Sequence, residues 1–271
     1  MTGAIMNARM YSVTPAVETL WRELLQHVTA EARVPLTYIP YPAPQPLEDL
    51  WSRPDLGCVF MCGYPMALKL APVVPVAAPV PRASWAAGRP VYRSDLIVRE
   101  EAPFRTLEDT FGGRAGWTVE HSHSGFNAFR HHLLRYRTPD RPKLYGQMLG
   151  QLVTARAILD AVRDGRIDVG PLDAYWHLLI AQHHPSLTRG IRVLETTDVA
   201  TMPAFVTAES TPPAIVEALR DAFAHASRRP WFAEFADGLL IDGFAPVDAA
   251  EYERTLEWDR EAKAAGYPIP A

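Results

Sequence analysis

The sequence predicts an α/β protein built from two lobes. Short apolar runs alternate with segments of helical periodicity along most of the chain, which is the pattern of α/β folds with largely parallel sheets. The 25 prolines often flank these runs, as expected of many short loops between strands and helices. A chain of 271 residues can bury a large core, and this length favours two lobes over one.

The first hundred residues supply several of the expected elements. Thr14 and Pro15 are typical of an N-cap and a first helical position, and apolar residues at helical spacing follow them. Residues 56–62 are apolar throughout, as in a buried parallel strand. Further strands are expected at 9–13, 36–40, 73–80 and 95–98, and a short helix at 46–51.

The alternation begins again after residue 100. Residues 144–162 carry helical spacing, although their first half is ambiguous between helix and strand. Helices are also expected at 106–109, at 174–180 and over most of the chain from 212 onward, and strands at 116–119, 168–173, 191–194 and 204–207.

Residues 120–127 are the most informative segment for function. A strand-like run gives way to Ser122, His123 and Ser124, and a helical pattern follows at once. The start of a helix presents backbone N–H groups without intrahelical partners at the positive end of the helix dipole, which suits a small anion. A serine can also serve only as the helix cap, but capping needs one hydroxyl. The run therefore predicts anion binding.

Composition argues against several other classes of protein. The 27 Lys and Arg residues face 31 Asp and Glu residues, so no overall basic field exists to hold nucleic acid or a membrane. No stretch of 18 apolar residues occurs, which argues against a membrane span. Cys58 and Cys62 lie about 13 Å apart if their run is a strand, too far for a disulfide. We expect two buried thiols.

The N-terminal residues lack the charged and apolar regions of a secretory signal. As the sequence stands, this predicts a cytoplasmic protein. The periplasm is the alternative if an export signal is missing from the sequence.

The order of four motifs resembles the PhnD-like, phosphonate-binding branch of the periplasmic solute-binding proteins. The resemblance covers roughly residues 10–244 and implies the type 2 periplasmic-binding-protein fold, an α/β fold with a ligand cleft between two lobes. It also implies a first lobe of residues 1–94 plus 200–271 and an inserted second lobe of residues 95–199. The motifs are CGYP at 62–65, PVYRSDLIVR at 90–99, SHSGF at 122–126 and GRIDVGPLD at 165–173.

The resemblance also implies a set of ligand-binding residues. Tyrosines would line the cleft, and hydroxyls with helix N–H groups would bind the oxyanion, while a carboxylate could pair with an amine on the same ligand. The residues are Tyr11, Tyr64, Tyr92, Ser94, Ser122, His123, Ser124, Thr154 and Asp173. Relatives often carry a Ser-Gly-Ser-His element where this chain has Leu152-Val153-Thr154-Ala155, so only the Thr154 hydroxyl remains there.

Simpler interpretations exist for several of these residues. The tyrosines could be core aromatics, and Asp173 could be only the N-cap of the next helix. The histidine doublets point their rings apart, whereas a zinc site needs three or four converging ligands, so we expect no metal and no cofactor. The run at 121–125 lacks the first glycine of a nucleophile elbow, which argues against a hydrolase of that type.

Two functions remain open at this stage. The first is a non-catalytic, monomeric binding protein that closes on a small phosphonate-like or phosphate-like anion and feeds an ABC transporter permease or a regulator, with no nucleic-acid partner. The alternative is an enzyme on the same bilobal fold, similar to menaquinone-pathway or thiamine-precursor enzymes. There, His123 would be the general base.

Overall fold

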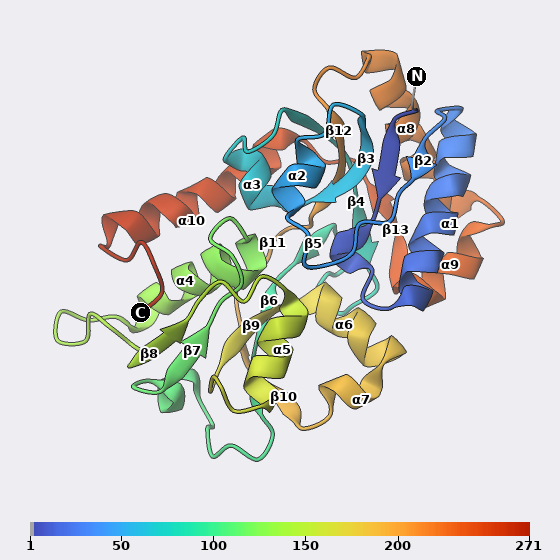
Figure 1. The fold of residues 1–271 in the computed structure, drawn as a ribbon. Helices are drawn as coiled ribbons and strands as arrows, with labels where there is room; N and C mark the ends of the chain where they lie inside the picture. Colours follow the sequence, from blue (N-terminus) through green and yellow to red (C-terminus); the bar gives the residue numbers. More distant parts are fainter. Residues whose placement is uncertain (1–2) are drawn as a thin grey trace. The chain divides into compact units, whose positions relative to one another are not determined.

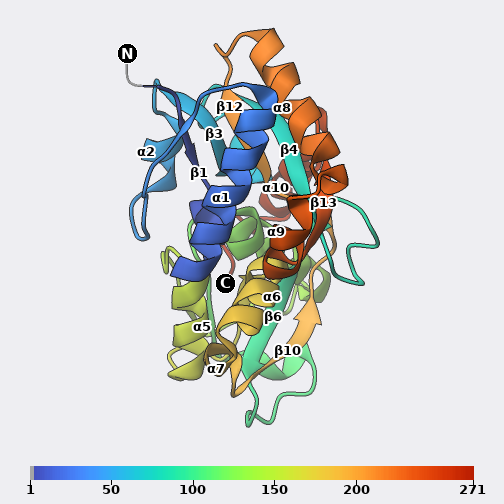
Figure 2. The same cartoon turned by 90° about the vertical axis from the view of Figure 1, so that its right-hand side faces the viewer.

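The computed structural model describes residues 3–271, which form two compact units (Figures 1 and 2). One unit comprises the chain up to Tyr92 together with Thr201–Glu253. The other comprises Arg93–Ala200 together with Arg254–Ala271. The short strands β5 (Val91–Tyr92) and β11 (Ala200–Thr201) lie where the chain passes from one unit to the other.

A six-stranded mixed sheet forms the centre of the first unit. β1 runs parallel to both of its neighbours, whereas β12 is antiparallel to β3 and β4, and β13 is antiparallel to β4. The expectation of largely parallel sheets was therefore wrong, because strand direction depends on long-range connections that periodicity does not record. The sheet order is β13 (Ile241–Ala245), β4 (Val73–Pro81), β12 (Ala204–Ala208), β3 (Leu56–Met61), β1 (Ile5–Asn7) and β2 (Thr37–Tyr38).

Helices pack on this sheet around an aromatic core. Thr14 caps the first helix by accepting a hydrogen bond from Val17 N, and Pro15 is its first residue, as predicted. Trp21 meets Phe60 and Phe205 edge to face, and such burial of large rings is a main source of core stability. The helical segments are α1 (Pro15–Ala32), α2 (Leu47–Trp51), α3 (Gly63–Ala67), α8 (Pro213–His225), α9 (Phe232–Leu239) and the short turns η1 (Arg9–Tyr11), η5 (Ala226–Arg228) and η6 (Ala249–Tyr252).

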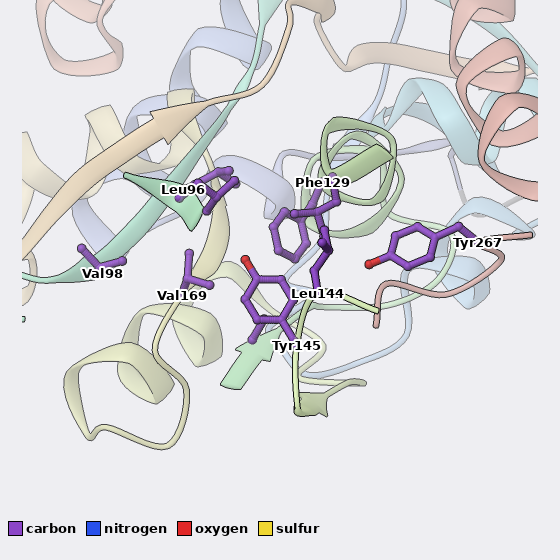
Figure 3. Close-up of a cluster of buried hydrophobic side chains, with 10 residues drawn as sticks. Leu96, Val98, Phe129, Leu144, Tyr145, Val169 and Tyr267 are labelled. Atoms are coloured by element: carbon purple, nitrogen blue, oxygen red, sulfur yellow. The ribbon is translucent and has the colours of Figure 1, made fainter. Parts of the chain in front are cut away.

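The second unit contains a three-stranded antiparallel sheet, in the order β10 (Ile191–Thr196), β6 (Ser94–Arg99) and β9 (Gly170–Asp173). β7 (Arg114–Gly116) pairs in parallel with β8 (Gln147–Leu149), and a single parallel bridge joins Ala115 to Val169. The core of this unit includes Leu96, Phe129 and Tyr145 (Figure 3).

The helical segments of the second unit follow the ends of these strands. They are η2 (Leu107–Thr110), η3 (His123–Asn127), α4 (Ala128–Leu133), η4 (Leu134–Tyr136), α5 (Ala155–Arg163), α6 (Ala174–His183) and α7 (Pro185–Thr188). The last helix, α10 (Glu253–Ala264), starts at the boundary residue of the first unit and continues in the second.

Residues 254–271 pack in the second unit, whereas the resemblance implies that they belong to the first lobe. Arg130 of α4 forms an ion pair with Asp259 of α10 at 2.5 Å, and both side chains are buried. Asn127 Nδ2 donates to Thr255 O at 2.8 Å. Tyr267 belongs to the same hydrophobic core as Phe129 (Figure 3). Nothing in the local sequence marks this return, because the contacts are tertiary.

The structure differs from two local expectations and confirms a third. The first strand is Ile5–Asn7, and the segment predicted as a strand at 9–13 starts with the turn η1 instead. β13 interrupts the C-terminal region that was expected to be mainly helical. Cys58 and Cys62 are free and buried, as predicted. None of the helices among residues 3–271 has the length and hydropathy that a bilayer crossing requires.

Candidate functional site

The helix that follows Ser122 begins with an unusual turn. Ser122 is the N-cap, and its Oγ accepts a hydrogen bond from Gly125 N at 3.0 Å. The first turn, η3, is a π-helix in which Asn127 N donates to Ser122 O at 3.0 Å, and such wide turns are frequent at functional sites. Gly125 is required here, because a Cβ at that position would lie 2.0 Å from Thr118 Oγ1.

Ser94 fixes this helix start to the sheet. Its Oγ donates to Ser124 O at 2.8 Å, and its own N–H donates to Thr197 Oγ1 at 2.9 Å. Ser94 also pairs in register with Asp173 across β6 and β9. Since Ser94 is fully buried and its hydroxyl proton is already donated, the side chain acts in positioning the backbone of Ser124.

A second helix start carries the Thr154 hydroxyl. Thr154 Oγ1 accepts from Ala157 N at 3.1 Å and thereby caps α5. The residue before it, Val153, has a φ of 66°, a left-handed conformation that is strained for a β-branched side chain. Strain of this kind persists where the surrounding structure imposes it and is concentrated at ligand-binding loops.

Thr118 connects the two helix starts. Its N–H donates to Gly125 O at 3.1 Å, and its carbonyl accepts from Val153 N at 3.3 Å. Its Oγ1 is buried and has no hydrogen-bond partner among residues 3–271. A buried hydroxyl without a partner costs free energy, and this one lies against Gly125, where an added Cβ would be 2.0 Å from it. Thr118 was not among the predicted site residues, although it lies in the strand-like run 116–119 that leads into the Ser-His-Ser-Gly turn.

Asp173 caps α6, as its alternative interpretation predicted. Its Oδ1 accepts from Tyr175 N at 2.9 Å and from Trp176 N at 3.0 Å. The carboxylate therefore already compensates the dipole at this helix start, and α6 does not offer a third anion position.

The His123 ring lies in side-chain packing. It stacks on Trp258 of α10, with ring centroids 5.1 Å apart, and its Nδ1 lies 3.3 Å from Asn127 Nδ2. Burial, with a smaller effect of the charge of His131, lowers the pKa of His123 to about 3. The imidazole is therefore neutral at physiological pH.

This shift predicts how stability depends on pH. Because the unfolded chain binds a proton on His123 near pH 6.5 and the folded chain does not, stability should fall as pH drops from 6.5 toward about 3. The loss due to this group is roughly 1.4 kcal/mol per pH unit. Urea denaturation of wild type and His123→Gln between pH 7 and 4 tests it. The exposed control His184→Gln should keep the pH dependence of the wild-type stability. The prediction is wrong if the stability of His123→Gln also depends on pH as that of the wild type does.

The three predicted tyrosines lie in the first unit and are buried. Tyr11 belongs to η1, directly after β1, and its ring meets Phe60 edge to face at 5.1 Å. Tyr64 belongs to α3, directly after β3. The hydroxyl of Tyr92 lies 3.4 Å from Cys62 Sγ. The structure thus places Tyr11 and Tyr64 after the carboxyl ends of two adjacent strands.

The nine predicted residues therefore fall into two groups. The first unit holds the three tyrosines, and the second holds the other six. Within the second unit, hydrogen bonds and strand pairing connect the positions of Ser94, Ser122, Ser124, Thr154 and Asp173 through β6, β9 and Thr118. Among residues 3–271, no group of three or more His, Cys, Asp or Glu side chains is placed to hold a metal ion.

Three solved structures with a similar fold are informative. The binding component of a phosphonate ABC transporter from Pseudomonas aeruginosa has a TM-score of 0.80 at 15% identity, covering 98% of this chain and 88% of that one. PhnD1 from Prochlorococcus marinus, in complex with methylphosphonate, has a TM-score of 0.77 at 14% identity, covering 97% and 98%. A Xanthomonas citri protein bound to ATP has a TM-score of 0.68 at 18% identity, covering 98% of each chain.

These likenesses confirm the predicted two-lobed α/β fold class of periplasmic binding proteins. No curated protein sequence gives a significant match. The family model for the periplasmic phosphonate substrate-binding proteins of ABC transporters matches residues 12–252, which is most of the chain and confirms the resemblance found in the sequence. The protein belongs to the family of periplasmic substrate-binding proteins that serve ABC phosphonate transporters.

Proposed function

We propose that this protein binds a small phosphonate-like oxyanion at the helix starts of Ser122–Gly125 and Thr154. The observation that carries the proposal is the unpartnered buried hydroxyl of Thr118, which lies between those two helix starts. In a family that binds phosphonates, this arrangement supports an anion position in the second unit.

The chemistry of this region suits a tetrahedral oxyanion. The N–H groups at a helix start and nearby hydroxyls are donors, and two helix dipoles add partial positive charge without any Lys or Arg side chain. This local charge matters because the whole chain has a net charge of −4, so long-range attraction does not draw anions to the protein. Ser122 and Thr154 stabilise the two helix starts as N-caps. The Ser124 hydroxyl is the donor that we assign to the ligand.

The ligands of similar structures narrow the chemical class. Methylphosphonate and ATP, the molecules bound in two of them, share tetrahedral phosphorus carrying several oxygens. We therefore assign this chain a small alkylphosphonate or phosphate ester. The contacts of Tyr11, Tyr64 and Tyr92, the pairing of Asp173 with a ligand amine and the enclosure of the ligand between two lobes stay predictions from the family resemblance.

The family also supports the cellular location and the partner that we propose. Its members are periplasmic proteins of ABC transporters, so the cytoplasmic location expected from the N-terminus is not supported. We infer that the protein works as a monomer, delivers its ligand to an ABC permease and binds no nucleic acid.

The enzymatic alternative finds little support in the site. A general base works best when its pKa lies near the operating pH, whereas the pKa of His123 is lowered to about 3. The ring is also stacked on Trp258 inside the second unit. We propose that the protein has no catalytic activity.

The decisive experiment is isothermal titration calorimetry with methylphosphonate, ethylphosphonate, phosphate and acetate. We expect binding of the phosphorus oxyanions and none of acetate. Ser124→Ala should weaken phosphonate binding about tenfold or more, because a hydrogen bond to a charged group contributes about 1.5–3 kcal/mol. Ser186→Ala, an exposed serine of the same unit, is the matched control. If none of the phosphorus oxyanions binds to the wild type, the proposal is wrong.

A further inference from the structure

We propose that Arg9 is an anion-binding residue of the first unit and holds an acidic oxygen of a phosphonate or carboxylate ligand. This inference rests on the proposed function and deepens it, because it assigns the proposed ligand class a cationic side chain, whereas the helix starts of the second unit offer only neutral donors. Neither the sequence motifs nor the family resemblance pointed to Arg9.

The position of Arg9 in the sheet is the first argument. β1 lies between β2 and β3 and runs parallel to both. The chain leaves β1 toward β2 on one side, whereas it leaves β3 toward β4 on the other side. The carboxyl ends of two parallel strands whose connections diverge in this way are the usual ligand-binding position of α/β sheets. Arg9 lies two residues after the last residue of β1.

The backbone of Arg9 is fixed by hydrogen bonds. Arg9 N donates to Asn7 Oδ1 at 2.7 Å, and Asn7 Nδ2 in turn donates to Ile39 O at 2.7 Å. Arg9 O accepts from Ser12 N at 3.2 Å. Because Asn7 is itself buried in β1, the base of the Arg9 side chain is held rigidly at this end of the strand.

One nitrogen of the guanidinium group lacks a hydrogen-bond partner. Its Nη1 is buried and has no hydrogen-bond partner among residues 3–271. The guanidinium carbon lies over the ring of Tyr41, 5.7 Å from the ring centroid. Burial lowers the pKa of Arg9 below its ordinary value, against smaller opposing effects of Tyr41 and Glu48. The protein therefore keeps a buried cationic nitrogen whose hydrogen-bonding capacity is unused, which is costly unless a partner binds.

Other arginines of the first unit behave differently. Arg53 binds both carboxylate oxygens of Asp55 at 2.8 Å, and Arg82 pairs with Asp237 and Asp242. The planar guanidinium matches carboxylate and phosphate oxygens in two-point contacts. The unused donor of Arg9 therefore fits either a phosphonate group or a carboxylate group.

The test compares Arg9→Gln and Arg9→Lys with the wild type by isothermal titration calorimetry, using ethylphosphonate and phosphonoacetate as probes. Arg22→Gln is the matched control, because Arg22 and its partner Glu23 are both well exposed. Arg9→Gln should weaken the binding of at least one probe roughly ten- to hundredfold, the range expected for a charge-assisted hydrogen bond. Arg9→Lys should recover part of this loss, and Arg22→Gln should bind like the wild type.

The pattern of losses identifies the bound group. Equal losses for both probes assign Arg9 to the phosphonate, whereas a loss for phosphonoacetate alone assigns it to the carboxylate. If both probes bind to Arg9→Gln within twofold of the wild type, the inference is overturned while the proposed function stands. If the wild type binds neither probe, both fail.

Thermal unfolding without ligand separates a binding role from a structural one. Removal of an unpaired buried cation should leave the melting temperature of Arg9→Gln unchanged or raise it. A lower melting temperature together with unchanged binding would show that Arg9 serves packing against Tyr41 and would also overturn the inference.

Discussion

Replacement of Arg130 by alanine is expected to lower the free energy of unfolding by about 3–5 kcal/mol, the cost of breaking a buried ion pair. The side chains of Arg130 and Asp259 are 1% and 8% exposed. The same guanidinium also donates to Asn127 Oδ1 at 2.7 Å and to Pro268 O at 2.6 Å. Its removal takes a charged partner away from the buried Asp259 carboxylate, which also accepts a hydrogen bond from Lys263 Nζ at 2.7 Å.

Urea denaturation followed by circular dichroism measures this effect. The matched control is Arg156→Ala, because the pair of Arg156 with Asp160 lies within one exposed face of α5 and such surface pairs contribute less than about 1 kcal/mol. A loss in Arg130→Ala no larger than that in Arg156→Ala would show that the interior pair does not support the second unit. Arg130→Met, which keeps most of the apolar volume, should lose less than Arg130→Ala if unfilled space adds to the cost.

Substitution of Gly125 by alanine should have a large effect on both stability and ligand binding. The added Cβ would lie 2.0 Å from Thr118 Oγ1 and 2.8 Å from Thr118 Cγ2, so either the helix start or the strand end has to move. Overpacking of this kind costs about 1–3 kcal/mol of stability. Since a displacement near 1 Å can remove a hydrogen bond with correct geometry, we expect phosphonate affinity to fall at least tenfold.

A double substitution tests the cause. Thr118→Ala removes the two side-chain atoms that lie closest to the added methyl group, so Gly125→Ala with Thr118→Ala should be more stable than Gly125→Ala alone. Thermal unfolding and calorimetry with methylphosphonate give both quantities. If the double variant is no more stable than Gly125→Ala, the close approach of Thr118 is not the reason for glycine at this position.

Local sequence signals predicted much of the fold. The Thr14-Pro15 pair located the start of α1, and the continuous apolar run at 56–62 located β3, because capping and burial act within a few residues. β1 was misplaced, since its three residues are too few to show a period. β13 was missed because Leu240 and Ile241 continue the apolar residues at the end of α9, and its partner β4 lies far away in the sequence.

Local sequence signals also predicted part of the candidate site. Ser122 and Thr154 cap helices where the sequence placed hydroxyls at helix starts. In contrast, the burial of His123 against Trp258 and the unused donor of Arg9 depend on residues distant in the sequence. Thr118 has no motif of its own, and only its contact with Gly125 distinguishes it from any other threonine at the end of a strand.

The return of residues 254–271 to the second unit has a consequence for synthesis on the ribosome. When translation has reached Glu253, the first unit has all of its strands, whereas Arg130 still lacks the carboxylate of Asp259. A nascent chain at that stage holds a guanidinium that its surroundings do not neutralise, so the second unit completes its interior only after α10 has emerged. Cotranslational folding of the second unit is therefore expected to lag behind that of the first unit.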